Sequence, residues 1–467
     1  MNKRAKKILI DVLIHVGSFV LFVFYFLICG IPLVVGFLPL LLLAHIKIIE
    51  YQKTKKTNTL YFGFLFVIGL SLIIFAQRYA KVSPYYIPLP AIGMLIVILF
   101  SSLELALLMN LCLSVFVGFI FQVDLYLTCI IFLGSMIATF FVYRIRQRYK
   151  IIQAGLMASA MMTVAILSIS YRSDIGFFSF ASPHIIPACT NGILSAFLVS
   201  GALPIFEFLF RMVSNISLLE LSDFNHPLLK RLVLEAPGTY HHSLLVGNLA
   251  EIAAETVNAN ALLVRVGSYY HDIGKLEKPE YFSENQEQSF SRHEQLKASM
   301  SKLVIINHVK NGVGLAKKHK LNAAVIDFIE QHHGTSLVIY FYRRALEESN
   351  KDEDIKEDVF RYNGPKPQTK ETAIVLLADS AEAACRSLED PNAQRIDEVV
   401  HTVINNKFID GQLDDCDLTL KDLDKIAKTF VRILSAIYHS RIEYPDMPDE
   451  DASKQPTKKI QNRFTTN

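Results

Sequence analysis

The sequence predicts an all-α protein made of an N-terminal bundle of transmembrane helices and a soluble, all-helical domain. The 467 residues are 51% hydrophobic with a mean hydropathy of +0.31, too apolar for an ordinary soluble protein, and the excess ends near residue 210. Beyond that point apolar residues recur at helical spacing, and no segment alternates as a strand does. We therefore expect a membrane bundle over 1–210, a soluble domain over 211–445 and a polar, disordered tail over 446–467.

Apolar runs in the first part are long enough to cross a bilayer, which takes about 20 helical residues. The predicted spans lie near residues 8–28, 31–49, 59–77, 87–101, 103–121, 125–143, 152–170 and 186–210. The fourth and fifth meet at Ser101-Ser102, so the number of spans stays open between seven and eight. Pro84, Pro88 and Pro90 indicate either a broken, re-entrant segment or a simple external loop.

Basic residues in the short loops predict how the bundle is oriented. They gather before the first span, after the second and after the sixth, and everything after residue 210 falls on the same side if there are eight spans. The three groups are Lys3, Arg4, Lys6 and Lys7; Lys53, Lys55 and Lys56; and Arg144, Arg146, Arg148 and Lys150. Short cytoplasmic loops are rich in Lys and Arg, so this side is expected to face the cytoplasm.

The soluble part reads as a series of helices. Thr239 is expected to cap the first of them after the Pro237-Gly238 turn, and a second is expected to run from Asn260 until Gly274 ends it. Further helices are expected over residues 297–318, 322–333, 370–388, 392–408 and 419–440, with a charged loop over 348–370.

Composition and motifs exclude several classes of function. A net charge of +3 and a pI of 8.3, with no nucleic-acid-binding motif, predict no nucleic-acid partner. The six cysteines show no CxxC spacing, which disfavours a disulfide framework or a zinc ribbon. No Walker-type glycine-rich loop occurs. The charges near the spans, Glu104 and Asp124, lie at predicted ends, which disfavours transport.

The strongest functional signal is a cluster of histidines around an adjacent His-Asp pair. Nine of the 14 histidines fall between His226 and His333. Imidazole and carboxylate together suit Mn, Fe, Co or Zn, and a helical bundle can direct them into one cavity. Seven residues match the ligand number of a dinuclear site, in which the carboxylate of Asp272 can bridge. They are His242, His271, Asp272, His308, His332, His333 and Asp379.

Two basic residues near this cluster are candidates for contact with substrate. Lys275 follows the His-Asp pair by one turn and could bind phosphate or donate a proton, or it could merely complement a helix C-terminus. Arg386 lies seven residues after Asp379 on the same helix face and could bind phosphate, or it could pair with Glu382. The catalytic candidates are thus His271, Asp272 and Lys275, and the substrate-binding candidates are Lys275 and Arg386. His241 is taken as a neighbour of the ligand His242, and structural or surface roles are assigned to His293, His319, His401 and His439.

Several longer motifs carry a resemblance to a known family. They include Ala236-Pro237-Gly238-Thr239-Tyr240-His241-His242-Ser243, Tyr270-His271-Asp272-Ile273-Gly274-Lys275, Glu284-Asn285-Gln286, Gln331-His332-His333-Gly334-Thr335 and Asp379-Ser380-Ala381-Glu382-Ala383-Ala384. Over residues 200–445 the chain resembles the HD superfamily of metal-dependent phosphohydrolases. It is most similar to the bacterial seven-transmembrane HD family, whose members hydrolyse cyclic di-AMP.

The resemblance implies a mechanism and a cellular location. His242, His271, Asp272 and Asp379 would hold one metal ion, and His308, His332 and His333 the second, with Asp272 bridging. Manganese or iron is implied, and a metal-bridging hydroxide would open cyclic di-AMP to pApA. The implied partners are the cyclic dinucleotide and the lipid bilayer, with a possible homo-oligomer. The implied location is the bacterial cytoplasmic membrane, multi-pass, with the N-terminus and the HD domain in the cytoplasm.

Two departures from the family pattern leave alternatives open. The large extracytoplasmic domain usual after the first span is missing, because the chain passes to the second span at Gly30-Ile31-Pro32. Ser291-Arg292-His293-Glu294 and Asn363 also depart from the usual residues of loops that could line the substrate pocket. Cyclic di-GMP, a guanosine polyphosphate or a nucleotide monophosphate therefore remain alternative substrates, although no Gly-Tyr-Pro motif typical of the cyclic di-GMP branch occurs. A membrane receptor that binds a nucleotide without turnover remains a further alternative.

Overall fold

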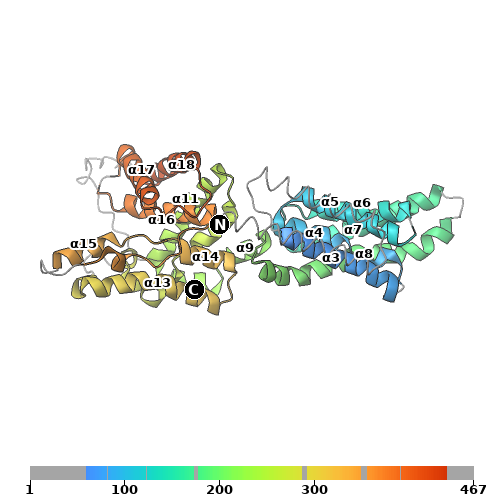
Figure 1. The fold of residues 1–467 in the computed structure, drawn as a ribbon, viewed down its shortest axis with the longest axis horizontal. Helices are drawn as coiled ribbons and strands as arrows, with labels where there is room; N and C mark the ends of the chain where they lie inside the picture. The colour runs from blue at the N-terminus through green and yellow to red at the C-terminus, as the bar shows by residue number, and fades with distance from the viewer. Residues whose placement is uncertain are drawn as a thin grey trace, which may run out of the picture.

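The computed structural model describes residues 59–80, 82–122, 124–172, 177–286, 292–348, 355–389 and 391–438. These ranges are helical throughout apart from turns and loops, and their extended backbone pairs only at one isolated bridge, Leu337 with Arg361. Two bodies of helices follow one another, and the short helix α9 (Asn215–Leu221) lies between them (Figure 1). The predicted all-α class is confirmed. The predicted spans 8–28 and 31–49 and the tail 446–467 lie outside the described residues.

The first body contains the other predicted spans. Its helices are α3 (Thr59–Phe75, continuing as the π-helical turn Ala76–Ala80), α4 (Pro90–Phe100), α5 (Leu103–Ile120), α6 (Leu125–Phe141), α7 (Tyr149–Arg172) and α8 (Phe177–Phe210). In the described residues, four segments are long and apolar enough to cross a membrane: Tyr61–Ala80, Leu103–Ile120, Tyr149–Tyr171 and Ala181–Phe210. The segments Pro84–Phe100 and Leu125–Phe141 are apolar but shorter.

The fourth predicted span is a broken segment. Helix α4 has 11 residues, which at about 1.5 Å per residue gives about 16 Å, half of a bilayer core of about 30 Å. A 3-10 turn, Pro84–Tyr86, precedes it. The amide of Asn191 on α8 donates to the carbonyls of Tyr85 and Ile87 at 2.7 and 2.8 Å, so the interrupted backbone is satisfied inside the bundle. Of the two interpretations of the proline-rich stretch, the structure therefore favours the broken segment.

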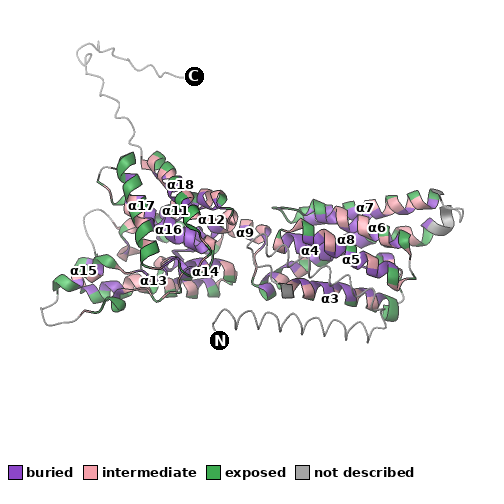
Figure 2. Ribbon diagram, turned by 45° about the horizontal axis from the view of Figure 1, so that its top comes forward, coloured by how far each residue is buried: buried purple, intermediate pink, exposed green. Residues whose placement is uncertain are grey.

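Small residues bring the two longest helices of this body together. A side chain on Gly155 of α7 would overlap the carbonyl of Gly192 on α8, and the reverse also holds. Close approach at glycine is the usual way in which membrane helices gain packing contact. Buried positions face the inside of this body (Figure 2). Its exposed positions include large apolar side chains such as Phe197 and Phe208.

The second body is the soluble domain. After α9 it comprises α10 (Pro227–Glu235), α11 (Pro237–Thr256), α12 (Ala261–Tyr270), α13 (Ala298–Lys318), α14 (Ala323–Gln331), α15 (Ile339–Glu348), α16 (Lys370–Arg386), α17 (Ala393–Ile409) and α18 (Leu420–Tyr438). Helix α16 is central and packs against α11, α12, α14, α17 and α18. Every residue from Thr372 to Asp379 is buried, as expected of a helix surrounded on all sides.

Two hydrophobic cores meet in this domain. One is formed mainly by α11, α16, α17 and α18, and includes Leu249, Ala378 and Phe430. The other is formed mainly by α10, α12, α13 and α14, and includes Tyr270 and Ile329. Residues of the predicted metal cluster lie in α11 and α16 on one side, and in α13 or directly after α12 and α14 on the other, so the cluster lies where the cores join.

Two predicted helix ends were wrong. Helix α11 begins at Pro237, and Thr239 is already inside it. The backbone N–H of Thr239 is capped by the side chain of Asn285, at 3.1 Å, from a loop distant in sequence. Helix α12 ends at Tyr270, before Gly274, which lies in the 3-10 helix Ile273–Glu277. A Cβ on Gly274 would overlap the carbonyl oxygen of His308, so this glycine serves close packing of α13 and not helix termination.

Candidate metal centre

The fold brings all seven predicted ligands together from three helices and from the residues that directly follow two others. His242 lies in the second turn of α11, and His308 lies midway along α13. His271 and Asp272 follow the last residue of α12, and His332 and His333 follow the last residue of α14. Asp379 lies in α16. Six of the seven residues are buried, while the side chain of His333 is 21% exposed.

Asp272 lies between two groups of histidines. Its Oδ2 lies 3.1 Å from Nε2 of His271 and 3.7 Å from Nε2 of His242. Its Oδ1 lies 3.3 Å from Nε2 of His308 and 3.6 Å from Nε2 of His332. One carboxylate therefore presents a separate oxygen to each group, which is the arrangement that a bridging ligand needs.

Asp379 makes a second connection between the groups. Its Oδ1 lies 3.1 Å from Nε2 of His242, and its Oδ2 lies 3.6 Å from Nδ1 of His333. Three sets of residues each offer candidate ligand atoms, and within each set these atoms lie within 4.8 Å of one another. The sets are His242, His271 and Asp379; His271, Asp272 and His332; and His308, His332 and His333.

Three of the buried histidines of the centre have the same ring orientation. Nδ1 of His271 contacts the carbonyl of Ser268 at 2.6 Å, and Nδ1 of His308 contacts that of Ile305 at 2.5 Å. Nδ1 of His332 likewise contacts backbone carbonyls of α14, the nearer at 3.0 Å. With Nδ1–H donated to a carbonyl, the lone pair of Nε2 faces the centre, as in most protein metal sites.

The buried polar atoms at the centre fit divalent ions. Among the described residues, Nε2 of His271 and Oδ1 of Asp272 are buried without a hydrogen-bond partner. Such atoms are costly in a protein interior unless something satisfies them. A mixed set of imidazoles and carboxylates suits divalent transition metals, so the residues present match the metal ions that their pattern predicts.

Electrostatics favours the ligand forms of Asp272 and His308. Burial raises the pKa of Asp272, but His271 and Lys275 outweigh burial and hold that pKa well below its usual value. Burial lowers the pKa of His308 to about 4, so this imidazole is neutral at physiological pH. His242 differs. Burial lowers its pKa, but hydrogen bonds to Asp379 and Glu382 overcome burial and raise it to about 9.

Lys275 and Arg386 occupy different places. Nζ of Lys275 lies 2.8 Å from Oδ2 of Asp272 and 2.6 Å from Oε1 of Glu284, so Lys275 adjoins the centre. Arg386 is 38% exposed, and its guanidinium lies 3.5 Å from Oε2 of Glu382. The fold thus places the Arg386–Glu382 pair behind the ligands, and this pair was the alternative role weighed for Arg386.

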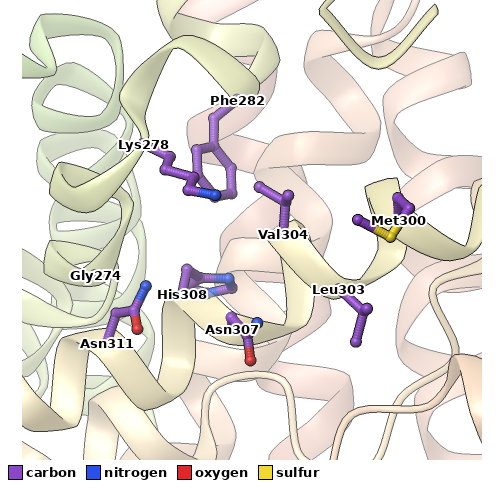
Figure 3. A pocket seen from close by; sticks show the side chains of 9 residues that line it. All are labelled: Gly274, Lys278, Phe282, Met300, Leu303, Val304, Asn307, His308 and Asn311. Atoms are coloured by element: carbon purple, nitrogen blue, oxygen red, sulfur yellow. The ribbon is translucent and has the colours of Figure 1, made fainter. Parts of the chain in front are cut away.

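A groove borders the centre on its α13 side (Figure 3). Its volume is about 290 Å³, and His308 forms part of its wall. The 3-10 segment above it contributes Lys278 and Phe282, and α13 below it contributes the polar Asn307 and Asn311 together with apolar side chains (Figure 3). The ring of Phe282 also meets the ring of His308 edge-on at 5.8 Å.

Three residues near the centre have contacts with it that sequence reasoning did not predict. Glu284 holds Lys275, Glu382 holds His242, and the ring of Tyr362 stacks on that of His333 at 4.3 Å. Glu284 and Glu382 both belong to motifs that carried the family resemblance. Tyr362 lies in the loop before Gly364, and its position in the sequence does not indicate that its side chain reaches His333.

Comparison with known proteins matches both bodies. Residues 12–214 match the family model of a 7TM receptor with intracellular HD hydrolase, and residues 239–384 match the model of an HD domain. The cyclic-di-AMP phosphodiesterase PgpH of Bacillus subtilis is 38% identical over 431 residues, which are 90% of this chain and 60% of that protein. The PgpH of Listeria monocytogenes is 35% identical over 429 residues, which are 90% of this chain and 59% of that protein.

A solved structure also matches the soluble domain. The HD domain of L. monocytogenes PgpH in complex with cyclic-di-AMP is 46% identical. The match covers 46% of this chain and 100% of that one, with a TM-score of 0.45. The chain spans about three fifths of the length of the two PgpH proteins.

An apolar helical bundle followed by a helical domain with this His/Asp cluster defines a membrane protein that carries an HD domain. In sequence the chain is similar, from its N-terminal to its C-terminal part, first to the family of 7TM receptors with an intracellular HD hydrolase and then to the HD domain.

Proposed function

We propose that this protein is a membrane-anchored, metal-dependent phosphodiesterase that hydrolyses cyclic di-AMP to pApA. The observation that carries the proposal is the position of Asp272, whose two oxygens face two separate groups of histidines. That geometry suits two divalent ions a few Å apart. Such a pair supplies an activated water and stabilises the attacking and leaving oxygens of a phosphoryl transfer.

The ligands divide between the two ions as the distances suggest. His242, His271, Asp272 and Asp379 are proposed to hold one ion. His308, His332 and His333 are proposed to hold the other, with Asp272 shared. Manganese or iron is proposed for both positions, because imidazole and carboxylate ligands suit either metal.

The chain itself contributes orientation and charge to the reaction. Backbone carbonyls fix the rings of His271 and His308, so their Nε2 atoms need no reorientation when substrate arrives. Lys275 is proposed to bind a substrate phosphate oxygen or to donate a proton to the leaving group, because its ammonium adjoins Asp272. Burial lowers the pKa of Lys275, but Asp272 and Glu284 more than offset this and raise it, so the ammonium keeps its charge.

Cyclic di-AMP is preferred as the substrate because the two PgpH proteins are named for it and match 90% of this chain. Cyclic di-GMP and guanosine polyphosphates are alternatives within the same chemistry. A nucleotide-binding receptor without turnover is the alternative outside it. The presence of all seven candidate ligands at one centre favours turnover over binding alone.

The proposed location is the bacterial cytoplasmic membrane, with the N-terminus and the HD domain in the cytoplasm. Arg148, in the basic loop between α6 and α7, makes a two-pronged ion pair with Glu220 of α9, at 2.5 and 2.7 Å. This contact between the basic loop and the start of the HD domain supports the proposal, because basic loops are typical of the cytoplasmic side. We also propose the division into a bundle over 1–210, an HD domain over 211–445 and a polar tail.

The full-length protein in detergent tests this function directly. It would be loaded with Mn²⁺ and given cyclic di-AMP, cyclic di-GMP or guanosine tetraphosphate in separate reactions, with the products separated by chromatography. We expect pApA from cyclic di-AMP and little product from the others. Hydrolysis of another nucleotide in preference would change the substrate assignment, and binding of cyclic di-AMP without any product would favour the receptor.

A further inference from the structure

His242 differs from the other buried histidines of the centre in what holds its second nitrogen. Nδ1 of His271, His308 and His332 contacts backbone carbonyls, whereas Nδ1 of His242 contacts Oε2 of Glu382 at 2.6 Å. A carbonyl accepts the N–H but carries no net charge. A carboxylate accepts it with a full charge, which makes the bond stronger and the imidazole a better donor.

The surroundings of Glu382 fix this carboxylate in place. Glu382 is 1% exposed. Its Oε1 accepts from the hydroxyl of Tyr438 on α18 at 3.4 Å, and the guanidinium of Arg386 lies 3.5 Å from Oε2. A buried carboxylate without partners would be costly, so the contacts with His242, Arg386 and Tyr438 explain how it is tolerated there.

Helix α16 places this carboxylate relative to the centre. Asp379 and Glu382 are three residues apart, so both side chains lie on one face of the helix. The ring of His242 lies between them, with Nε2 at 3.1 Å from Asp379 and Nδ1 at 2.6 Å from Glu382. The position and the tilt of the ring are thereby both determined by α16.

We propose that Glu382 is the positioning residue for the metal ligand His242: it accepts the Nδ1–H bond and so directs the Nε2 lone pair toward the ion shared with His271, Asp272 and Asp379. Arg386 and Tyr438 act one step further out, by holding Glu382. This inference rests on the proposed metal site, and it assigns Arg386 to the support of that site and not to substrate. Loss of such a partner typically lowers metal affinity about 10- to 100-fold.

The test uses the full-length protein in detergent and follows Mn²⁺ binding alone, by titration and by metal content after desalting. Glu382→Ala is expected to weaken one of two sites about 10- to 100-fold and to leave the other unchanged. Glu382→Gln is expected to recover part of the loss, because its amide oxygen can still accept from Nδ1–H. Tyr438→Phe is expected to cause a smaller loss than Glu382→Ala.

Glu371→Gln is the matched control, because Glu371 lies on the same helix and caps the backbone N–H of Asn260 at 2.9 Å, away from the centre. It should bind two ions with wild-type affinity. The inference is overturned if Glu382→Ala binds like wild type, if glutamine recovers nothing, or if Glu371→Gln loses as much. Wild-type protein that binds no Mn²⁺ would refute the metal site and the inference together. Binding of Mn²⁺ without hydrolysis of cyclic di-AMP would refute only the proposed function.

Discussion

Replacing Asp272 by alanine should remove both metal ions at once, whereas replacing His308 by alanine should remove one. Asp272 presents one oxygen to each group of histidines, and His308 belongs to only one group. Hydrolysis should be lost in both variants, so activity cannot separate them. Metal content and thermal stability can.

The size of the stability effect follows from ligand linkage. A site held at 100 times its dissociation constant stabilises the folded state by about 2.7 kcal/mol. One kcal/mol shifts the Tm of a domain of this size by about 2–4 °C, so each ion should raise the Tm by about 5–11 °C. The wild-type protein should therefore gain about 10–20 °C from Mn²⁺, His308→Ala about half of that, and Asp272→Ala almost nothing.

The assay compares each protein in EDTA with the same protein in Mn²⁺, so that changes in metal-free stability cancel. Such a change is expected for Asp272→Ala, because Lys275 loses one of its two carboxylates and keeps only Glu284. The loss of metal-free stability in Asp272→Ala should stay below the roughly 3–5 kcal/mol that a fully broken buried ion pair costs. An Asp272→Ala variant that still gains a full Mn²⁺ shift and retains two ions would refute the bridging geometry.

Three further changes have expected outcomes. Gly274→Ala should lower the free energy of unfolding by about 1–3 kcal/mol, because its Cβ would overpack against α13. The control Gly314→Ala has open space at its Cβ and should be neutral or stabilising by up to about 1 kcal/mol. Equal denaturation midpoints for the two variants would contradict the packing argument. His226 caps α10. Burial, and to a smaller extent the nearby His319, lowers its pKa. The stability that neutral His226 contributes is therefore present above its unfolded pKa of about 6.5 and is lost as the pH falls. His226→Asn keeps a capping side chain that does not titrate. In EDTA, its Tm should fall less between pH 7.5 and 5.5 than the Tm of the wild type, and an equal or greater fall would contradict this. Arg148→Ala should change the free energy of unfolding by less than about 1 kcal/mol, because the pair that it breaks is about half exposed; a loss of several kcal/mol would show that the contact carries more than its exposure implies.

Helix positions could be predicted from the sequence because they depend on local pattern. Asn322 and Asn392 cap α14 and α17 at the expected starts, and α16 begins at Lys370 as predicted. The seven candidate ligands, which the fold brings together, could also be listed in advance, because histidine and aspartate side chains offer the same ligand atoms wherever they lie in the chain. Helices α9, α10 and α15 were not among the predicted helices.

The errors arose where distant residues decide the local structure. Thr239 has a typical capping side chain, but Asn285 reaches its backbone N–H from 46 residues away. Gly274 resembles a helix terminator, but the requirement there is set by the carbonyl of His308. The pairing of Arg386 with Glu382, four residues before it, was one of the two roles weighed and is found in the structure, but spacing could not reveal that Glu382 also contacts His242 at 140 residues' separation. Such contacts depend on tertiary packing, which single-sequence patterns do not encode.

The centre is assembled from segments far apart in the chain, and this makes metal affinity a gauge of how well the whole domain is packed. His242 and Asp379 are 137 residues apart, so their approach depends on α11 and α16 having docked along the core that includes Leu249 and Ala378. A substitution deep in that core could weaken metal binding as much as the loss of a ligand does. Inactivating mutations in this domain should therefore be sorted first by whether excess Mn²⁺ restores hydrolysis. Excess metal compensates for affinity lost through poor packing, but not for loss of the bridging carboxylate.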